Sequence, residues 1–251
     1  MDQAIKRRII KGALFGLSGI ILLGAGIIVL FYSGVLWFNM PSRDQYPVRG
    51  VDVSHYQGRI DWTVLAQEDI SFAFIKATEG SGTVDECFAA NWTAAQDTAL
   101  YVGAYHFFSF DSAGQTQAEN FISTVPVCEN ALPPVIDLEY YGDKAAHPPA
   151  YDAVCAELSV LIDALTAHYG AAPIIYTTTD CYTRYLEPSD VDCPLWIRDV
   201  LDEPEITGWD FWQYSNFGRL DGYAGEESGI DMNVYRGSEQ EFRAQFALTE
   251  K

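Results

Sequence analysis

The chain has 251 residues, and its 15 Lys and Arg residues stand against 35 Asp and Glu residues, which gives a formal charge of −20. A surface this acidic repels phosphate backbones, so the composition argues against any nucleic-acid partner. Hydrophobic residues make up 49% of the chain and aromatic residues 14%, which is too rich in core-forming side chains for a disordered protein.

The N-terminal segment has the pattern of a membrane anchor. Four basic residues at positions 6, 7, 8 and 11 precede a run without charges over residues 12–40. Because a bilayer core needs about 20 apolar residues, this run predicts a transmembrane signal anchor, with residues 1–11 as a basic cytoplasmic tail. A short linker over residues 41–47 would then lead to a domain over residues 48–251, held outside the cytoplasm at the cell membrane. A long, cleaved signal peptide is the alternative, and it would release this domain as a secreted protein.

Five cysteines lie in the exported part, at positions 87, 128, 155, 181 and 193. Export permits disulfides, and the short segment between Cys181 and Cys193 favours that pair, although the sequence does not fix the pairing. The cysteines lack the CxxC and Cys/His spacings of zinc sites, so we expect neither a metal nor another cofactor.

From Val48 onward, strand-length apolar runs alternate with helical patterns. The runs predict eight strands of the kind buried on both faces, as in parallel sheets, at residues 50–54, 72–78, 101–108, 135–139, 173–177, 195–198, 211–214 and 230–235. Helices are expected at residues 61–68, 85–97, 112–123, 151–169 and 180–186, with Asp61 capping the first, Ser112 capping the third and Gly170 ending the fourth. The pattern favours an α/β fold, a TIM-like barrel of eight strands with about five helices, over a doubly wound open sheet.

Acidic residues stand where the barrel strands end, at the place where such barrels carry their chemistry. They are Asp52 on the first strand, Asp137 and Glu139 on the fourth, and Asp231 on the eighth. One residue separates Asp137 from Glu139, so their side chains point to the same face. Repulsion and burial raise the pKa of at least one carboxyl, which is how a general acid stays protonated near neutral pH. Asp52 and Asp231 should be neighbours because the first and last strands of a closed barrel adjoin.

Aromatic residues crowd the same strand ends and predict an elongated carbohydrate groove, because aromatic faces pack against the C–H faces of sugar rings. They are Tyr56, Tyr105, Phe107, Phe108, Tyr140, Trp196, Trp212 and Tyr214. Of the four histidines, His106 on the third strand is the one expected at the site.

Seven short motifs together resemble the family-25 glycoside hydrolases, the Chalaropsis-type lysozymes. The opening motif is Gly50-Val51-Asp52-Val53-Ser54-His55-Tyr56-Gln57-Gly58, followed by Ile60-Asp61-Trp62. The others follow in the family's order: Phe74-Ile75-Lys76-Ala77-Thr78-Glu79-Gly80, Gly103-Ala104-Tyr105-His106-Phe107, Asp137-Leu138-Glu139, Leu195-Trp196-Ile197, Trp212-Gln213-Tyr214 and Asp231-Met232-Asn233. The sequence departs from the family pattern at Arg198, where a small residue is more usual.

The resemblance implies hydrolysis of the β-1,4 bond between N-acetylmuramic acid and N-acetylglucosamine in peptidoglycan. It implies that Glu139 is the general acid and that Asp52, Asp137 and Asp231 are the other acidic site residues. Attack on the anomeric carbon could come from the substrate's own N-acetyl group, assisted by Asp137, or from a carboxylate. We expect the substrate to contact Tyr56, Lys76, Tyr105, His106, Phe107, Tyr176, Trp196, Gln213 and Tyr214.

Three functions are compatible with these patterns. The first is a membrane-anchored muramidase that acts on peptidoglycan strands near its own membrane. The second is a catalytically silent barrel that binds peptidoglycan as a sensor or scaffold, and the intact pair of Asp137 and Glu139 argues against it. The third is a metal-dependent hydrolase, since carboxylates also bind Mg²⁺ or Zn²⁺, but few histidines stand at the barrel mouth.

Overall fold

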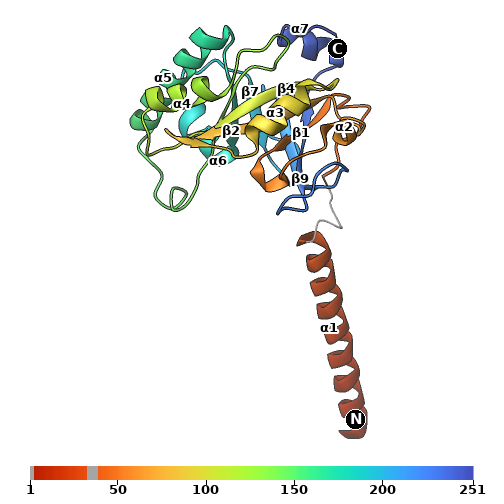
Figure 1. Cartoon of the computed structure of the whole chain (residues 1–251). Helices are drawn as coiled ribbons and strands as arrows, with labels where there is room; N and C mark the ends of the chain where they lie inside the picture. Colours follow the sequence, from red (N-terminus) through yellow and green to blue (C-terminus); the bar gives the residue numbers. More distant parts are fainter. Residues whose placement is uncertain (1–2, 33–38, 251) are drawn as a thin grey trace. The chain divides into compact units, whose positions relative to one another are not determined.

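The computed structural model describes residues 3–32 and 39–250 and divides into two compact units, Met1–Met40 and Pro41–Lys251. The first unit contains one helix, α1 (Gln3–Tyr32), drawn in red in Figure 1. The membrane anchor expected over residues 12–40 falls partly on residues 33–38, which lie outside the described part, as do residues 1–2 of the basic tail. A search of the described residues finds no helix with the length and apolar character needed to cross a membrane.

The second unit is a closed barrel of mixed strand direction. Its strands are β1 (Arg49–Val53), β2 (Phe72–Glu79), β3 (Thr83–Val84), β4 (Tyr101–Phe107), β5 (Val135–Leu138), β6 (Ile174–Thr178), β7 (Leu195–Arg198), β8 (Phe211–Gly218) and β9 (Ile230–Tyr235). Their order is β1-β9-β8-β7-β6-β5-β4-β2-β3, and an added pairing of β1 with β2 closes the ring. Within the described residues, all eight expected strands are therefore present, and β3 is a short addition at the edge of β2.

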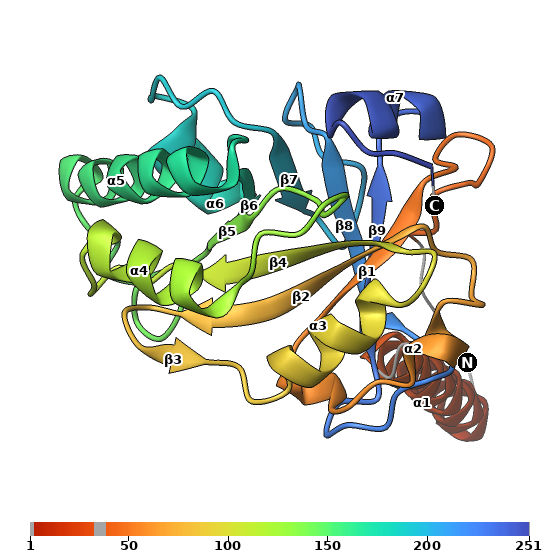
Figure 2. The same ribbon diagram turned by 45° about the horizontal axis from the view of Figure 1, so that its top comes forward.

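Helices cover the outside of the first two thirds of the barrel. They are η1 (His55–Gln57), α2 (Trp62–Leu65), α3 (Phe88–Gln96), α4 (Gly114–Thr124), α5 (Tyr151–Tyr169), α6 (Thr179–Cys181) and η2 (Tyr182–Leu186). Helix α7 (Glu239–Gln245) follows β9 instead, and its Phe242 packs against the interior residues Phe72 and Phe211. In Figure 2, α3 and α4 lie along β2 and β4, and α5 lies beside α4. The five expected helices are confirmed. The Asp61 side chain accepts hydrogen bonds from two backbone amides at the start of α2, and Gly170 ends α5 in a left-handed conformation. The expected cap at Ser112 is wrong, because Ala113 precedes α4 and no side chain among the described residues caps that helix.

The pleat of the strands separates two layers of core. Phe72 and Phe74 on β2 belong to the interior cluster, together with Trp196 on β7 and Phe211 on β8. The residues between them, such as Ala73, pack outward under the helices. Two glycines make room for this aromatic interior, because a Cβ at Gly50 or Gly103 would lie 2.4 or 2.5 Å from a ring carbon of Phe72 or Phe74.

The last third of the barrel has a different cover. Around β7, β8 and β9, an aromatic cluster of Tyr46, Trp209, Trp212 and Tyr214 packs with Ile197 and Val234 where the earlier strands have helices. Tyr46 lies in the stretch expected to be a linker, and it is buried against Trp209 and Trp212.

The expected pairing of Cys181 with Cys193 is wrong, because all five cysteines are free. Cys181 is buried in the core beside Thr178, whereas Cys193 is half-buried and lines a surface cavity together with Cys155.

Candidate active site

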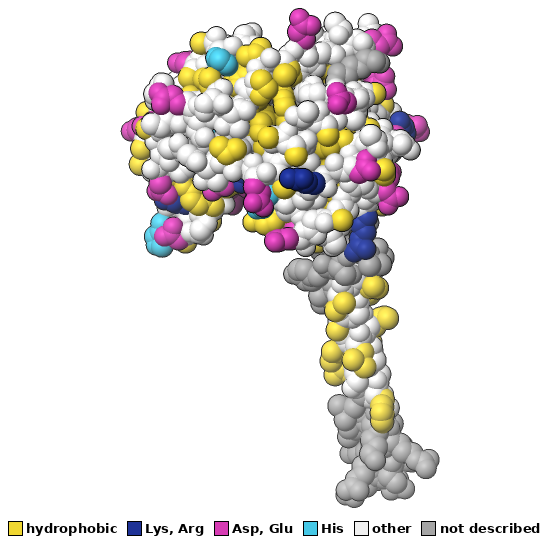
Figure 3. Space-filling model, viewed as in Figure 1, with side chains coloured by type: hydrophobic (Ala, Val, Ile, Leu, Met, Phe, Trp, Pro, Cys, Tyr) yellow, Lys and Arg dark blue, Asp and Glu magenta, His cyan; other side chains and the backbone are white. Residues whose placement is uncertain are grey.

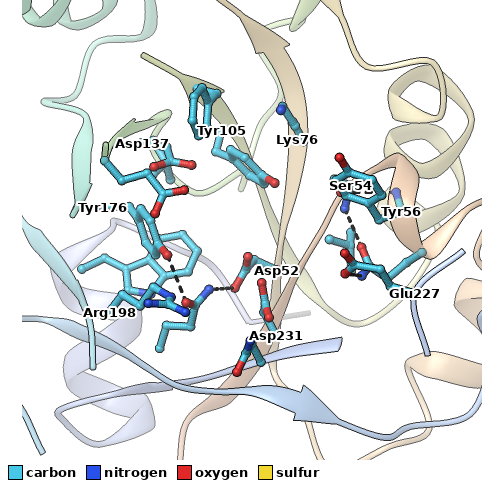
Figure 4. Close-up of a pocket in the computed structure, with 18 residues that line it drawn as sticks. Asp52, Ser54, Tyr56, Lys76, Tyr105, Asp137, Tyr176, Arg198, Glu227 and Asp231 are labelled. Atoms are coloured by element: carbon cyan, nitrogen blue, oxygen red, sulfur yellow. Dashed lines mark hydrogen bonds between the residues drawn. The ribbon is translucent and has the colours of Figure 1, made fainter. Parts of the chain in front are cut away.

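The mouth of the barrel holds a cavity of about 460 Å³ (Figure 4). Its lining continues the interior rows of the strands: Lys76 follows Phe72 and Phe74 on β2, and Asp137 follows Val135 on β5. All four predicted acids line this cavity, as do seven of the nine predicted substrate contacts: Tyr56, Lys76, Tyr105, Phe107, Tyr176, Trp196 and Gln213.

Two of the acids face each other across adjoining strands. Asp52 and Asp231 occupy paired positions of β1 and β9. We expected Asp231 at the carboxyl end of a parallel strand, and this is wrong, because β9 runs antiparallel to both of its neighbours. Asp231 is the second residue of β9, and the reversed direction brings that amino end to the rim where the other acids lie.

A chain of hydrogen bonds fixes the Asp52 carboxylate. The side-chain amides of Gln213 and Asn233 donate to its Oδ2 atom, at 2.9 and 2.7 Å. Tyr176 donates to the Gln213 carbonyl at 3.0 Å, and Trp196 donates to the Asn233 carbonyl at 2.9 Å. Both amides are thereby held in one orientation with their N–H groups toward Asp52, which favours its ionised form.

Burial dominates the electrostatics of the acids. It raises the pKa of Asp231 well above its usual range, and the neighbouring Asp52 charge raises it further. Burial also raises the pKa of Asp52, whereas the hydrogen bonds from Asn233 and Gln213 lower it in part. The hydrogen bond between the two carboxyls stabilises ionised Asp52 and protonated Asp231. The arrangement therefore indicates one shared proton in this pair, with Asp231 as its donor.

The second acid pair lies at the end of β5. Burial raises the pKa of Asp137 well above its usual range, and the nearby Glu139 charge raises it further. Burial raises the pKa of Glu139, and the opposing influence of Arg198 is smaller. The buried Oδ1 atom of Asp137 has no hydrogen-bond partner among the described residues, so it is free to accept one from a ligand.

His106 does not line the cavity, contrary to the expectation from the sequence. It is fully buried on the outer face of β4, between Tyr105 and Phe107, which both line the cavity. Its Nε2 atom lies 3.0 Å from the Gln117 carbonyl oxygen and its Nδ1 atom 2.7 Å from the Thr78 hydroxyl. Because Gln117 can only accept there, the ring is neutral with its proton on Nε2, and burial lowers its pKa to about 4.

Tyr214 does not line the cavity either, because it also lies on the outer face of its strand. Gln213 points into the cavity, so its neighbours on β8 point outward, and Tyr214 belongs to the outer aromatic cluster with Trp212. Phe108 is likewise buried in the outer core, and Tyr140 packs against Tyr185.

Several lining residues were not anticipated from the sequence. Arg198, at the end of β7, places a guanidinium in a cavity lined by carboxyls. The one sequence feature that points to this residue is its departure from the family pattern. Asn233 holds Asp52, although its motif had been noted only for Asp231. The far side of the cavity includes Ser54 and Gln57, which stand in the opening motif but had no predicted role. It also includes Asn216 on β8 and Glu227 in the loop before β9, which no sequence pattern marks.

This arrangement can protonate a bond and stabilise the positive charge that develops beside it. Burial raises the pKa of the Glu139 carboxyl above its usual range, and four other carboxyls line the same cavity. Across the described residues, no group of three or more His, Cys, Asp or Glu side chains is arranged to hold a metal ion.

The chain is similar to known proteins over most of its length. The family model of "Glycosyl hydrolases family 25" matches residues 51–223, which include Asp52, Asp137 and Glu139, whereas Asp231 lies beyond them. "Lysozyme M1" of Streptomyces globisporus is 33% identical over 78% of this chain and 70% of its own length. The uncharacterized protein YegX of Escherichia coli O157:H7 is 34% identical over 85% of this chain and 78% of its own. A solved family 25 glycosyl hydrolase from Bacillus anthracis is 50% identical, with a TM-score of 0.77 over 82% of this chain and 97% of that one.

Proposed function

The chain belongs to glycosyl hydrolases family 25 and is a lysozyme-type glycoside hydrolase, and we propose that it cleaves the β-1,4 bond between N-acetylmuramic acid and N-acetylglucosamine in peptidoglycan. The observation that carries this proposal is the cluster of four carboxyls at the barrel mouth, with raised pKa values at Glu139 and Asp137. An acid catalyst for glycoside hydrolysis needs such a raised pKa, so that it still holds its proton near neutral pH.

Glu139 donates its proton to the leaving glycosidic oxygen. It lies directly after β5, at the rim of the cavity, and it is half-buried. Its burial raises the pKa of the carboxyl and so favours the neutral form, and Arg198 offsets part of that effect. Asp52, with two amide donors on one oxygen, is held as an anion that stabilises positive charge on the sugar ring.

Asp137 orients the N-acetyl group of the muramic acid. Its buried Oδ1 lacks a partner among the described residues, and the acetamido N–H of the substrate supplies a donor that would satisfy it. Held in this way, the acetamido oxygen attacks the anomeric carbon, and water later opens the cyclic intermediate. This route retains the configuration at the anomeric carbon, whereas attack by water on the intact bond inverts it.

Digestion of purified peptidoglycan tests the reaction. New reducing ends on muramic acid, with retained configuration in early products followed by nuclear magnetic resonance, support the proposal. New reducing ends on glucosamine would move the cut to the other bond. Binding of glycan without any cleavage would favour a peptidoglycan-binding scaffold instead.

We also propose that the N-terminal segment attaches the enzyme to the cell membrane, with the barrel outside the cytoplasm. The support is the charge-free sequence over residues 12–40 behind four basic residues, and the exposure of large apolar side chains on α1, coloured yellow in Figure 3. Leu22 is 73% exposed and Leu23 69% exposed, which is unusual for leucines in contact with water.

Membrane fractionation tests this attachment. The full chain should sediment with membranes and resist extraction by carbonate, and a variant that lacks residues 1–40 should remain in the supernatant. Protease added to intact cells should digest the barrel of the full chain. A cellular form that has lost the first 40 residues and carries all activity would contradict the attachment.

A further inference from the structure

We propose that Arg198 binds a carboxylate on the substituent of the muramic acid ring, so that the enzyme selects glycan strands by the charge beside the scissile bond. This inference rests on the proposed muramidase reaction and adds a specificity-determining residue to it.

Arg198 lies at the point where the bond is cut. It ends β7, it is one interior position beyond Trp196, and it pairs in register with Thr178 on β6 and Gln213 on β8. Figure 4 shows its side chain beside Tyr176, with Lys76 and Glu227 on the other side of the cavity. Its positive charge acts on the Glu139 carboxyl, as well as on Asp52 and Asp231. The ring that carries the scissile bond must therefore lie within reach of the guanidinium.

The Arg198 guanidinium has no ionic or hydrogen-bond partner in the described part of the chain. The other lining cation, Lys76, does have partners. It forms an ion pair with Glu79 at 2.8 Å, and its Nζ atom lies 4.9 Å from the centre of the Phe107 ring. Arg198 is half-buried and faces carboxylates, yet none of them comes within salt-bridge distance. Its N–H donors are free, and their planar fork matches the two oxygens of a carboxylate.

The titratable groups that line the rest of the cavity are mostly acidic. Five carboxyls line it, at Asp52, Asp137, Glu139, Glu227 and Asp231. Lys76 also lines the cavity but is already paired with Glu79, so Arg198 is the lining cation that can pair with a carboxylate on the substrate. An unpaired charge close to the ionised acids is unfavourable. Arg198 thus acts both as a contact for one substituent and as a filter against misplaced strands.

Muramic acid brings such an anion to this place. Its ring carries a lactyl ether that ends in a carboxyl group, which is ionised in strands without peptide and is an amide where a peptide is attached. An attached peptide in turn carries carboxylates of its own. The two sources share one chemistry, a carboxylate on the muramoyl substituent, and they differ in the substrate that presents it.

Steady-state kinetics of the full-length protein in detergent micelles test the proposal. The substrates are peptide-free glycan strands, the same strands with their lactyl carboxyls converted to methylamides, and peptide-bearing strands. The variants are Arg198→Gln, Arg198→Lys and the control Arg243→Gln. Arg243 is on α7, which follows β9 at the opposite end of the barrel, and its one ion pair, with Glu239, is long at 3.9 Å. The control therefore changes the net charge by the same amount away from the cavity.

The wild type should have a KM about tenfold lower for the free lactyl strands than for the methylamides, as expected for a hydrogen-bonded charge pair. Arg198→Gln should remove this difference in KM between the two substrates, Arg198→Lys should keep part of it, and Arg243→Gln should behave as the wild type. A KM increase in Arg198→Gln on peptide-bearing strands alone would assign the carboxylate to the peptide.

Two results would overturn the inference. One is a wild-type KM that is the same for all three substrates, a measurement that needs no variant to fold. The other is an equal effect of Arg198→Gln on every substrate together with a shifted pH profile, because Arg198 would then only tune the acids. Absence of cleavage by the wild type on any strand would instead contradict the proposed muramidase reaction.

Discussion

Replacing Asp231 by Asn should stabilise the protein at neutral pH while removing most of its activity. Asp231 and Asp52 occupy paired positions on adjoining antiparallel strands, where Cβ atoms are about 5 Å apart. At an effective dielectric constant of about 20, two full charges at that distance repel by about 3 kcal/mol. Protonation of Asp231 already avoids part of this cost, so the variant should raise the free energy of unfolding at pH 7 by about 1–3 kcal/mol.

The pH dependence makes this prediction specific. Burial, and then the Asp52 charge, raise the pKa of Asp231 well above its ordinary 3.8. Above about pH 4 the native state therefore holds a proton that the unfolded chain has lost, so wild-type stability falls as the pH rises toward the raised value. Asn cannot titrate, and the gain in the variant should shrink near pH 4 and grow toward pH 7.

Urea unfolding of both proteins at pH 4 and pH 7, followed by tryptophan fluorescence, measures the difference. Asp163→Asn is a matched control, because Asp163 is exposed on α5 and its replacement removes one charge away from the site. A variant that is less stable than the wild type at pH 7, or equally stabilised at both pH values, would refute the electrostatic argument.

Two further predictions separate structural from catalytic roles. His106→Leu should lower the free energy of unfolding by about 1–3 kcal/mol, because Gln117 and Thr78 lose their buried partner. Its kcat, measured on refolded or low-temperature samples, should stay within a few-fold of the wild type. A large loss of kcat would show that His106 takes part in the reaction. Asp137→Asn should lower kcat by about 10²–10³ without lowering the free energy of unfolding, because burial and the Glu139 charge raise the pKa of Asp137 as well. If the variant cleaved as fast as the wild type, the orienting role of the Oδ1 atom would be wrong.

The sequence predicts the strands better than their directions. Short apolar runs mark β1 to β9 apart from the two-residue β3, and the strong periodicity of residues 151–169 gives α5 with its exact ends. The reversal of β9 cannot be read from such runs, because a buried strand has the same composition in either direction. Helix α7 was missed because its apolar face is small, with Phe242 as its buried residue.

The alternation of side chains along a strand predicts which residues reach the cavity, and the predictions that fail are those that did not use it. Alternation placed Asp137 and Glu139 on one face, and the structure brings both to the cavity. The same rule, counted from Tyr105, puts His106 on the outer face, but the motif that contains both residues drew attention to it. Asn233 and Glu227 reach the cavity through the reversed strand and the loop before it, so their positions depended on a topology that the sequence did not reveal.

Digestion of peptidoglycan by the wild type and by Glu139→Gln is the most direct test of the central claim, that Glu139 is the acid of a muramidase. The substitution keeps the size of the side chain and removes the proton that the reaction needs. The account predicts new reducing ends on muramic acid from the wild type and a loss of at least about 10²-fold in kcat in the variant, with glycan binding retained. Cleavage by Glu139→Gln at the wild-type rate would contradict the account.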